Sequence, residues 1–251
     1  MKLFQNWQNI PEDAKGAVLA IGNFDGMHLG HQALLNQVMT LSKQLGKPSG
    51  LITFEPITRA FFSSKTESDI SLMMGHNKVE YAKELGLDLY FQLSFDAYLS
   101  HHSGEIFIQK ILIDAIGVSH LVVGFDFLFG HKRSGDVDLL KTYKDDFGCT
   151  VVEKQMINGS KIGSSVIREA IQKGQLDLAK EILGHEWIVD ARICNNELDF
   201  GHYIQPGDGE YEVTCFVGEE KTKNTVIVEA KKIRLKSKIN TRQDQFLRLV
   251  F

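Results

Sequence analysis

The first 184 residues alternate short apolar runs with longer segments whose apolar residues recur at helical spacing. Residues 17–21 form a continuous apolar run, which is typical of a parallel strand buried on both faces. Residues 31–45 carry leucine and valine at three- and four-residue steps, which predicts an amphipathic helix. Further strands are expected at 51–54, 87–91, 121–123 and 150–153, and further helices at 78–85, 103–116 and 136–147. Residues 164–183 are expected to form one broken helix or two short ones around Gly174. This alternation predicts an α/β fold with a doubly wound parallel sheet and right-handed crossovers.

The pattern changes after Gly184. Apolar residues now alternate with polar ones or form short β-branched runs, with turns rich in Gly, Asp, Asn and Lys between them. We expect strands at 187–193, 211–217, 225–228, 232–235 and 245–251. No segment of helical period remains, so a small C-terminal antiparallel sheet or barrel is predicted. The chain is therefore divided into domains of residues 1–184 and 185–251.

Composition narrows the function classes. The 251 residues include 28 Lys and Arg against 32 Asp and Glu, a formal net charge of −4, so the chain lacks a strongly basic field for nucleic acid. No apolar run approaches the roughly 18 residues that span a bilayer, and the N-terminus lacks a signal-peptide core. The three cysteines match no metal-binding spacing. We expect a cytoplasmic protein without nucleic-acid or membrane partners, and the oligomeric state stays open.

The most informative motif, residues 22–31, directly follows the first predicted strand and reads G-N-F-D-G-M-H-L-G-H. In an open α/β sheet, ligands bind outside the carboxyl ends of the strands. Its glycines allow close approach of a ligand, and the N-terminus of the helix that begins here attracts phosphate. His28 and His31 are three residues apart, so on a helix they share a face and can donate to anionic oxygens. The alternative is a glycine-rich turn whose histidines only cap the helix.

A second motif, residues 161–168, opens another predicted helix after the fifth strand. We expect Ser164 to be the N-cap, and Ser165 with the helix-terminal amides to receive a phosphate. Arg168, one turn further, adds a planar cation suited to phosphate. Taken alone, this motif is explained better by a plain capped helix.

A third motif, residues 123–136, follows the fourth predicted strand and contains three phenylalanines near the strand end. These rings could stack on an aromatic ligand, and Asp126 could hold a ribose or a ring nitrogen. Core packing explains the phenylalanines almost equally well. Residues 53–56, T-F-E-P, end the second strand and are uninformative by themselves. Signatures of serine hydrolases, P-loop ATPases and kinases are missing from the sequence.

Together these motifs resemble the bacterial bifunctional FAD synthetase family, whose N-terminal module is an FMN adenylyltransferase and whose C-terminal module is a riboflavin kinase. Residues 28–31 are similar to the H-x-G-H signature of the nucleotidyltransferase superfamily, and residues 162–168 to its I-S-S-T-x-I-R-like signature. The longer family string G-x-F-D-G-x-H-x-G-H-Q is matched at every fixed position by residues 22–32. A family loop V-G-x-x-F-x-F-G-x-x-x-x-G-D is matched by residues 123–136.

The resemblance implies a Rossmann-like nucleotidyltransferase domain that transfers an adenylyl group from ATP to FMN, giving FAD and pyrophosphate. It implies Mg²⁺ carried mainly by the ATP phosphates, and we name no protein metal ligand. By the resemblance, the catalytic residues are His28, His31 and Arg168. The implied ATP-binding residues are Gly22, Asn23, Phe24, Asp25, Gly30, Ser164 and Ser165. The implied flavin-binding residues are Phe54, Glu55, Pro56, Asp126, Phe127 and Phe129.

The sequence also departs from the family pattern. The usual T-F-x-P-H-P is here T-F-E-P-I-T, with Ile57 and Thr58 in place of the histidine and the second proline, and Leu128 stands where arginine is common. No G-F-P-T-A-N-like string of a riboflavin kinase follows residue 183. We therefore expect a monofunctional adenylyltransferase whose C-terminal domain is a shortened, inactive kinase-like module. Two alternatives stay open: a related transferase with another acceptor, and a non-catalytic flavin-nucleotide-binding protein.

Overall fold

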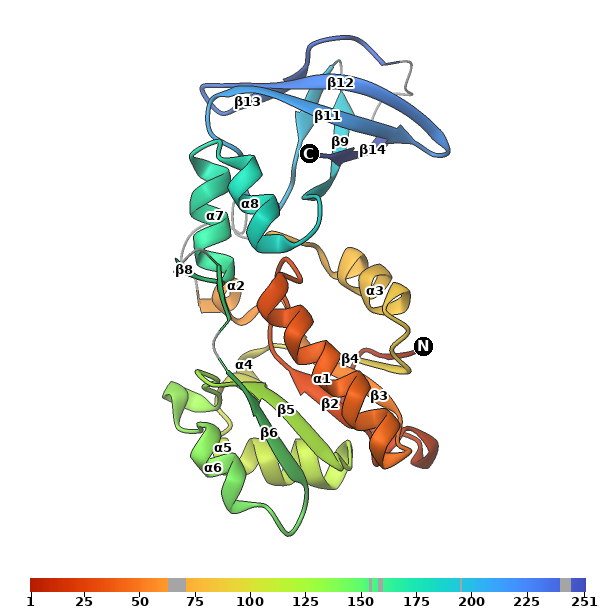
Figure 1. The fold of residues 1–251 in the computed structure, drawn as a ribbon, viewed down its shortest axis with the longest axis vertical. Coiled ribbons are helices and arrows are strands. Elements are labelled where there is room, and N and C mark those ends of the chain that lie inside the picture. Colours follow the sequence, from red (N-terminus) through yellow and green to blue (C-terminus); the bar gives the residue numbers. More distant parts are fainter. Residues whose placement is uncertain (63–70, 154, 158–159, 195, 240–244) are drawn as a thin grey trace. The chain divides into compact units, whose positions relative to one another are not determined.

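The computed structural model describes residues 1–62, 71–153, 155–157, 160–194, 196–239 and 245–251 (Figure 1). Within these, the chain folds as two compact units. Unit 1 comprises residues 1–24, 30–62 and 75–155. Unit 2 comprises residues 25–29, 71–74 and 156–251. The motif at residues 22–31 therefore runs from unit 1 into unit 2 and back.

Unit 1 is built on a six-stranded parallel sheet with the order β1-β4-β3-β2-β5-β6. Its strands are β1 (Lys2–Phe4), β2 (Val18–Ile21), β3 (Ser49–Glu55), β4 (Leu89–Ser94), β5 (His120–Gly124) and β6 (Gly148–Val152). From β2 the chain proceeds to one side through β3 and β4, and then to the other side through β5 and β6. The predicted doubly wound parallel sheet is confirmed. Its switch point lies between β2 and β5, where sheets of this class bind ligands.

Helices pack on this sheet as the periodicity predicts. They are α1 (Leu29–Leu45), α2 (Thr58–Phe62), α3 (Gly75–Glu84), α4 (Ala97–Ser100), α5 (Gly104–Ile106), the π-helix η2 (Phe107–Ala115) and α6 (Val137–Thr142), with 3-10 turns η1 (Glu12–Ala14) and η3 (His131–Arg133). Figure 1 shows α1 in front of the sheet and η2 behind it. Apolar residues of η2 such as Ile108 and Ile111 share one buried cluster with Leu19 and Ile21 of β2.

Two predicted helices differ in detail from the expectation. The helix expected at 103–116 does begin with Ser103 as its cap, because the Ser103 hydroxyl accepts a hydrogen bond from the Ile106 amide. From Phe107 onward, however, it is a π-helix, which periodicity cannot distinguish from an α-helix. The helix expected at 136–147 ends at Thr142. Asp145 and Asp146 would place two negative charges at its C-terminus, where the helix dipole disfavours them.

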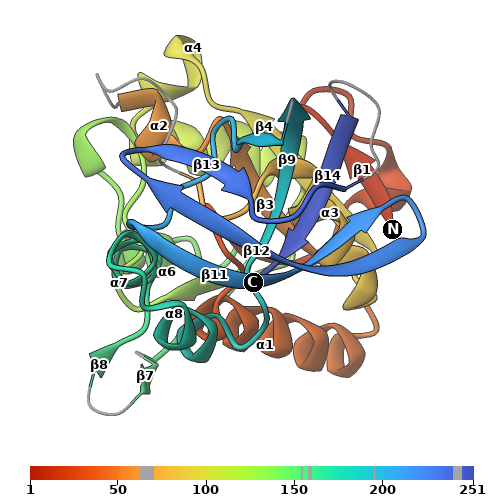
Figure 2. The same ribbon diagram turned by 90° about the horizontal axis from the view of Figure 1, so that it is seen from above.

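Unit 2 contains a closed six-stranded barrel together with two helices and a small hairpin. Its elements are β7 (Met156–Ile157), β8 (Ser160–Lys161), α7 (Ser164–Gln172), α8 (Leu176–Leu183), β9 (Ile188–Cys194), β10 (Glu197–Asp199), β11 (Gly209–Val217), β12 (Glu220–Glu229), β13 (Lys232–Leu235) and β14 (Gln245–Val250). The barrel order is β10-β13-β12-β11-β14-β9, and every pairing is antiparallel. Figure 2 shows the long β11–β12 hairpin, with β9 beside β14. The predicted antiparallel C-terminal domain is confirmed.

One buried cluster runs through unit 2 from α7 and α8 into the barrel, and it includes Ile171, Leu183, Val189 and Leu247. The two helices therefore pack with the barrel. The helical pattern at 164–183 is broken into two helices around Gly174, whose φ is +73°. The assignment of residues 1–184 and 185–251 as two functional modules stays a prediction. Among the described helices, none has the length and hydropathy to cross a membrane.

Candidate functional site

The backbone of the motif at residues 22–31 is unusual directly after β2. The Gly22 amide still donates to the Ile52 carbonyl of β3, at 3.1 Å. Phe24, Gly26 and Met27 then have φ values of +48°, +85° and +44°. A non-glycine residue in this left-handed region costs roughly 1–2 kcal/mol, so the surrounding contacts must compensate at Phe24 and Met27, both of which are fully buried. Such compensated strain is typical of functional loops.

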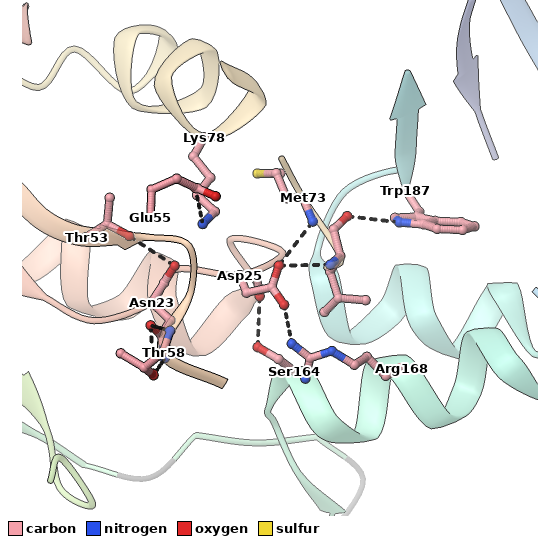
Figure 3. A network of polar contacts seen from close by, with 11 residues as sticks. Asn23, Asp25, Thr53, Glu55, Thr58, Met73, Lys78, Ser164, Arg168 and Trp187 are labelled. Carbon is pink, nitrogen blue, oxygen red and sulfur yellow. Dashed lines mark hydrogen bonds and ion pairs between the residues drawn. The ribbon is translucent and has the colours of Figure 1, made fainter. Parts of the chain in front are cut away.

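In unit 1, Asn23 is held by the end of β3 and the start of α2. Its backbone carbonyl accepts from the Thr53 hydroxyl at 3.1 Å. Its side-chain amide donates to the Thr58 hydroxyl at 3.0 Å and accepts from the Thr58 backbone amide at 3.2 Å (Figure 3). Thr58 stands where the family pattern has proline, which has no N–H to donate. This departure therefore gives the motif an additional anchor.

In unit 2, the Asp25 carboxylate is a hub of polar contacts and is only 1% exposed. One oxygen accepts from the backbone amides of Leu72 and Met73, at 2.9 and 3.1 Å. The other oxygen forms an ion pair with the Arg168 guanidinium of α7 (Figure 3). The structure thus brings together the two motifs that sequence reasoning treated separately.

Ser164 reaches the same hub, but not in the predicted way. The N-cap of α7 is Gly163, and Ser164 is the first helical residue. Its hydroxyl donates to the Asp25 backbone carbonyl at 2.8 Å and does not cap the helix. The prediction of Ser164 as N-cap is therefore wrong, because its hydroxyl has a long-range partner. Ser165, the second residue of α7, is exposed.

The two histidines of the motif lie on either side of the start of α1. His28 directly precedes α1, belongs to unit 2 and is 7% exposed. Its burial, assisted by the electrostatic effect of the neighbouring Arg168 and His185, lowers its pKa from 6.5 to about 4. His28 is therefore neutral at pH 7 and can donate one hydrogen bond. His31, in the first turn of α1 and in unit 1, places its ring 5.1 Å from the Phe24 ring. Gly30, which lies between His28 and His31 in the sequence, is the second residue of α1.

The residues expected on the flavin side all lie in unit 1, at the end of β3 and in the chain segments after β3 and β5. The Phe107 ring of η2 lies between Phe54 and Phe129, with its centroid 6.5 Å from that of Phe54 and 5.7 Å from that of Phe129. The Phe127 ring stacks on Phe129, with the centroids 5.3 Å apart. Phe54 is buried, whereas Phe127 and Phe129 are partly exposed and pack against the core. Asp126 is exposed. Phe127 and Phe129 thus contact the core and keep exposed surface, whereas Phe125, the third phenylalanine of the motif, is 41% exposed. Both interpretations of these rings stay open.

The remaining flavin-side residues end β3. Glu55 is its last residue, and Pro56 follows directly. The Glu55 carboxylate lies 4.0 Å from the ammonium of Lys78 on α3, and the Lys78 side chain is only 1% exposed. The sequence did not point to Lys78. It also did not point to the contacts that Leu72 and Met73 make with Asp25, or to those of His185 and Trp187. A buried lysine in a predicted helix has no pattern that separates it from a solvated one.

None of the described residues forms a group of three or more His, Cys, Asp or Glu side chains that could hold a metal ion. The cation that contacts the Asp25 carboxylate is Arg168. Within unit 2, the Arg168 guanidinium and the N-terminus of α7 are groups of the kind that bind anions.

Comparison with known proteins supports the motif assignments. A family model described as FAD synthetase matches residues 10–166. The chain is 35% identical over 199 residues to the bifunctional riboflavin kinase/FMN adenylyltransferase of Pseudomonas fluorescens, covering 78% of this chain and 63% of that protein. The protein of the same name from Buchnera aphidicola subsp. Schizaphis graminum is 33% identical over 198 residues, with the same coverage. The chain thus spans less than two thirds of the length of these relatives.

A solved structure has the same fold over nearly the whole chain. It is that of a protein named macrolide-efflux protein from Streptococcus pneumoniae, with a TM-score of 0.85, 19% identity, and coverage of 99% of this chain and 88% of that one. At this identity, the similarity concerns the fold alone. The family model, in contrast, covers more than half of the chain and includes the motif at residues 22–31. The chain therefore belongs to the FAD synthetase family.

Proposed function

We propose that this protein transfers an adenylyl group from ATP to FMN and releases pyrophosphate. The observation that carries the proposal is the buried contact between Asp25 and Arg168, which joins two phosphate-binding motifs 143 residues apart. The first motif follows β2 at the switch point of the sheet, where ligands of this fold class bind. The family and the names of the relatives support the same activity.

In this reaction, a phosphate oxygen of FMN attacks the α-phosphorus of ATP. A bond forms between these two atoms, the bond from the α-phosphorus to the bridging oxygen breaks, and pyrophosphate leaves with the electron pair. Such a transfer needs positioning and charge stabilisation and no covalent nucleophile from the protein. Mg²⁺, carried mainly by the phosphates, would neutralise part of their charge.

The predicted site residues have different roles in the proposed reaction. His28 and His31 donate hydrogen bonds to phosphate oxygens as negative charge develops. Because His28 is neutral before ATP binds, it contributes an N–H dipole in the free protein, and an approaching phosphate favours its protonation. Arg168 and Ser165, with the amides at the start of α7, hold the leaving pyrophosphate. The remaining predicted residues hold adenosine and the flavin ring.

We further propose that residues 1–184 form the adenylyltransferase module and that residues 185–251 form a kinase-like module without kinase activity. The lack of a G-F-P-T-A-N-like string in this stretch supports that division. A protein that uses ATP and FMN would act in the cytoplasm, where both are available.

The decisive experiment supplies ATP and Mg²⁺ with FMN or riboflavin as separate acceptors and identifies products by chromatography and mass spectrometry. We expect FAD and pyrophosphate from FMN, and no FMN from riboflavin. FMN formed from riboflavin would contradict the loss of kinase activity, and a lack of FAD from FMN would contradict the proposed transfer. His28→Ala and His31→Ala should each lower kcat about 100-fold or more with a smaller effect on ATP binding, whereas His101→Ala, at an exposed site, should not.

A transferase with another phosphate-bearing acceptor is the second candidate. The contact between Thr58 and Asn23 favours it, because it alters the segment after β3, on the expected acceptor side. Pyrophosphate release with FMN can be compared with release in the presence of other phosphorylated acceptors. Faster turnover with one of these would favour the second candidate.

A further inference from the structure

Two chain segments of unit 2 contact the motif residues that belong to the same unit. We call these segments, residues 71–74 and 185–187, the collar. Leu72 and Met73 of the collar donate their amides to the Asp25 carboxylate. His185 Nε2 lies 3.0 Å from the Gly26 carbonyl oxygen, close enough to donate a hydrogen bond to it. The collar therefore contacts both the side chain and the backbone of the motif.

The two collar segments are also joined to each other. The indole Nε1 of Trp187 donates to the Leu72 carbonyl oxygen at 3.1 Å, and the indole is almost fully buried (Figure 3). The Leu72 peptide groups thus link Trp187 on one side with Asp25 on the other. A shift of Trp187 would move the amides that hold the Asp25 carboxylate.

The collar is anchored in the barrel domain. Ser71 forms a parallel bridge with Tyr203, and its amide donates to the His202 carbonyl at 3.1 Å. The Trp187 ring lies 4.8 Å from the Phe251 ring, next to the end of β14. These contacts place the collar within the apolar cluster that fills the barrel. The position of the motif loop therefore depends on the barrel.

The motif loop is tightly packed against its neighbours at Gly26. A Cβ at Gly26 would lie 2.9 Å from the Leu72 side chain and 3.1 Å from the side chain of Leu183 at the end of α8. Close packing of this kind transmits displacements, because neighbouring atoms cannot move independently. A displaced Leu72 would shift Asp25, and the Arg168 guanidinium paired with Asp25 would then lose its orientation.

We propose that the barrel domain positions the phosphate-binding groups of the adenylyltransferase, and that Trp187 and His185 are the positioning residues. Trp187 acts through Leu72 on Asp25 and Arg168, and His185 acts through the Gly26 backbone. This inference rests on the proposed function. It gives residues 185–251 a role in the transfer reaction that needs no kinase chemistry. It also predicts that barrel substitutions weaken ATP binding more than FMN binding, because the collar contacts Asp25, one of the proposed ATP-binding residues.

The first test replaces Trp187 by phenylalanine, which keeps an aromatic ring but removes the N–H donor. The sequence contains only one other tryptophan, the half-buried Trp7, so Trp7→Phe is a matched control. We expect Trp187→Phe to weaken MgATP binding about three- to tenfold, the range of one lost hydrogen bond, with the affinity for FMN changed less than twofold. Trp7→Phe should change neither affinity. A merely structural role would lower the melting temperature and leave the MgATP affinity of the folded protein unchanged.

The control variant also provides a spectroscopic readout. In the Trp7→Phe protein, Trp187 is the only tryptophan, and its emission reports on the collar. We expect saturable changes in this emission when MgATP or inorganic pyrophosphate is added, with the same half-saturation as binding measured by calorimetry. This readout does not require turnover.

A second pair of variants keeps the inference testable if Trp187→Phe does not fold. His185→Gln retains a side-chain N–H donor and should bind MgATP like wild type, whereas His185→Phe should show the three- to tenfold loss. Wild-type MgATP binding in both Trp187→Phe and His185→Phe would overturn the inference and leave the proposed function intact. A wild-type chain that binds no MgATP would overturn the proposed function, and the inference with it.

Discussion

Replacing His28 by asparagine should change how the stability of the protein depends on pH. In the folded protein, burial lowers the pKa of His28 from 6.5 to about 4. Between these two values the unfolded chain binds a proton that the folded chain does not. The free energy of unfolding therefore falls as the pH drops through 6.5 and stops falling, as far as His28 is concerned, near pH 4. Asparagine cannot titrate, so the variant lacks this contribution.

The size of the effect follows from the two pKa values. The full difference between 6.5 and about 4 corresponds to about 3 kcal/mol of stability. Between pH 7 and pH 5, about 2 kcal/mol of this should already be lost in the wild-type protein. The substitution changes the stability at pH 7 as well, through packing. The informative quantity is therefore the change with pH in the difference between variant and wild type.

Urea unfolding followed by circular dichroism at pH 5, 6 and 7 measures this quantity. Relative to wild type, His28→Asn should gain about 2 kcal/mol from pH 7 to pH 5. His101→Asn, at an exposed histidine, is the control and should show a much smaller change. A difference between His28→Asn and wild type that stays constant over this range would refute the argument that His28 is buried in its neutral form.

Three further predictions concern the loop and its anchors. Asp25→Asn leaves Arg168 buried without its charge partner, and should lower the free energy of unfolding by about 3–5 kcal/mol in urea titrations; a loss below about 1 kcal/mol would contradict the pairing. Gly26→Ala meets both a φ of +85° and a clash at 2.9 Å, so it should cost more stability than Gly46→Ala, which has a φ of +61° and open space; equal losses would contradict the tight fit. Thr58→Pro removes a backbone N–H that anchors the motif, and should raise KM for ATP in steady-state assays about two- to tenfold, whereas Thr58→Ser should not.

The fold class was predictable because its signals are local. The run at residues 18–21 is apolar at every position, and all four residues are buried in the centre of the sheet. The barrel strands were recognised from alternation and turn residues. Short elements such as β1 and β10, each of three residues, were missed because they offer no period to count. They form because a neighbouring strand supplies hydrogen-bonding partners.

The positions of the site motifs were likewise determined by the sequence alone. We predicted an anion site from the spacing of glycines and histidines after β2 and of serines and arginine at the start of α7. The sequence also left two uses open for the phenylalanines near Asp126, and both stay open, because Phe127 and Phe129 pack against the core but keep exposed surface. Whether a ring packs in the core or faces a ligand depends on neighbours that are distant along the chain.

Only the tertiary structure decided what holds the site in place. The Asp25 carboxylate accepts a hydrogen bond from the amide of Leu72, 47 residues away, and pairs with the guanidinium of Arg168, 143 residues away. Backbone amides carry no sequence signal, and contacts between distant segments follow no period. Their formation depends on how the whole chain closes around the loop. The sequence therefore indicates the candidate groups for binding a phosphate, whereas the packing of unit 2 determines how firmly Asp25 and Arg168 are held.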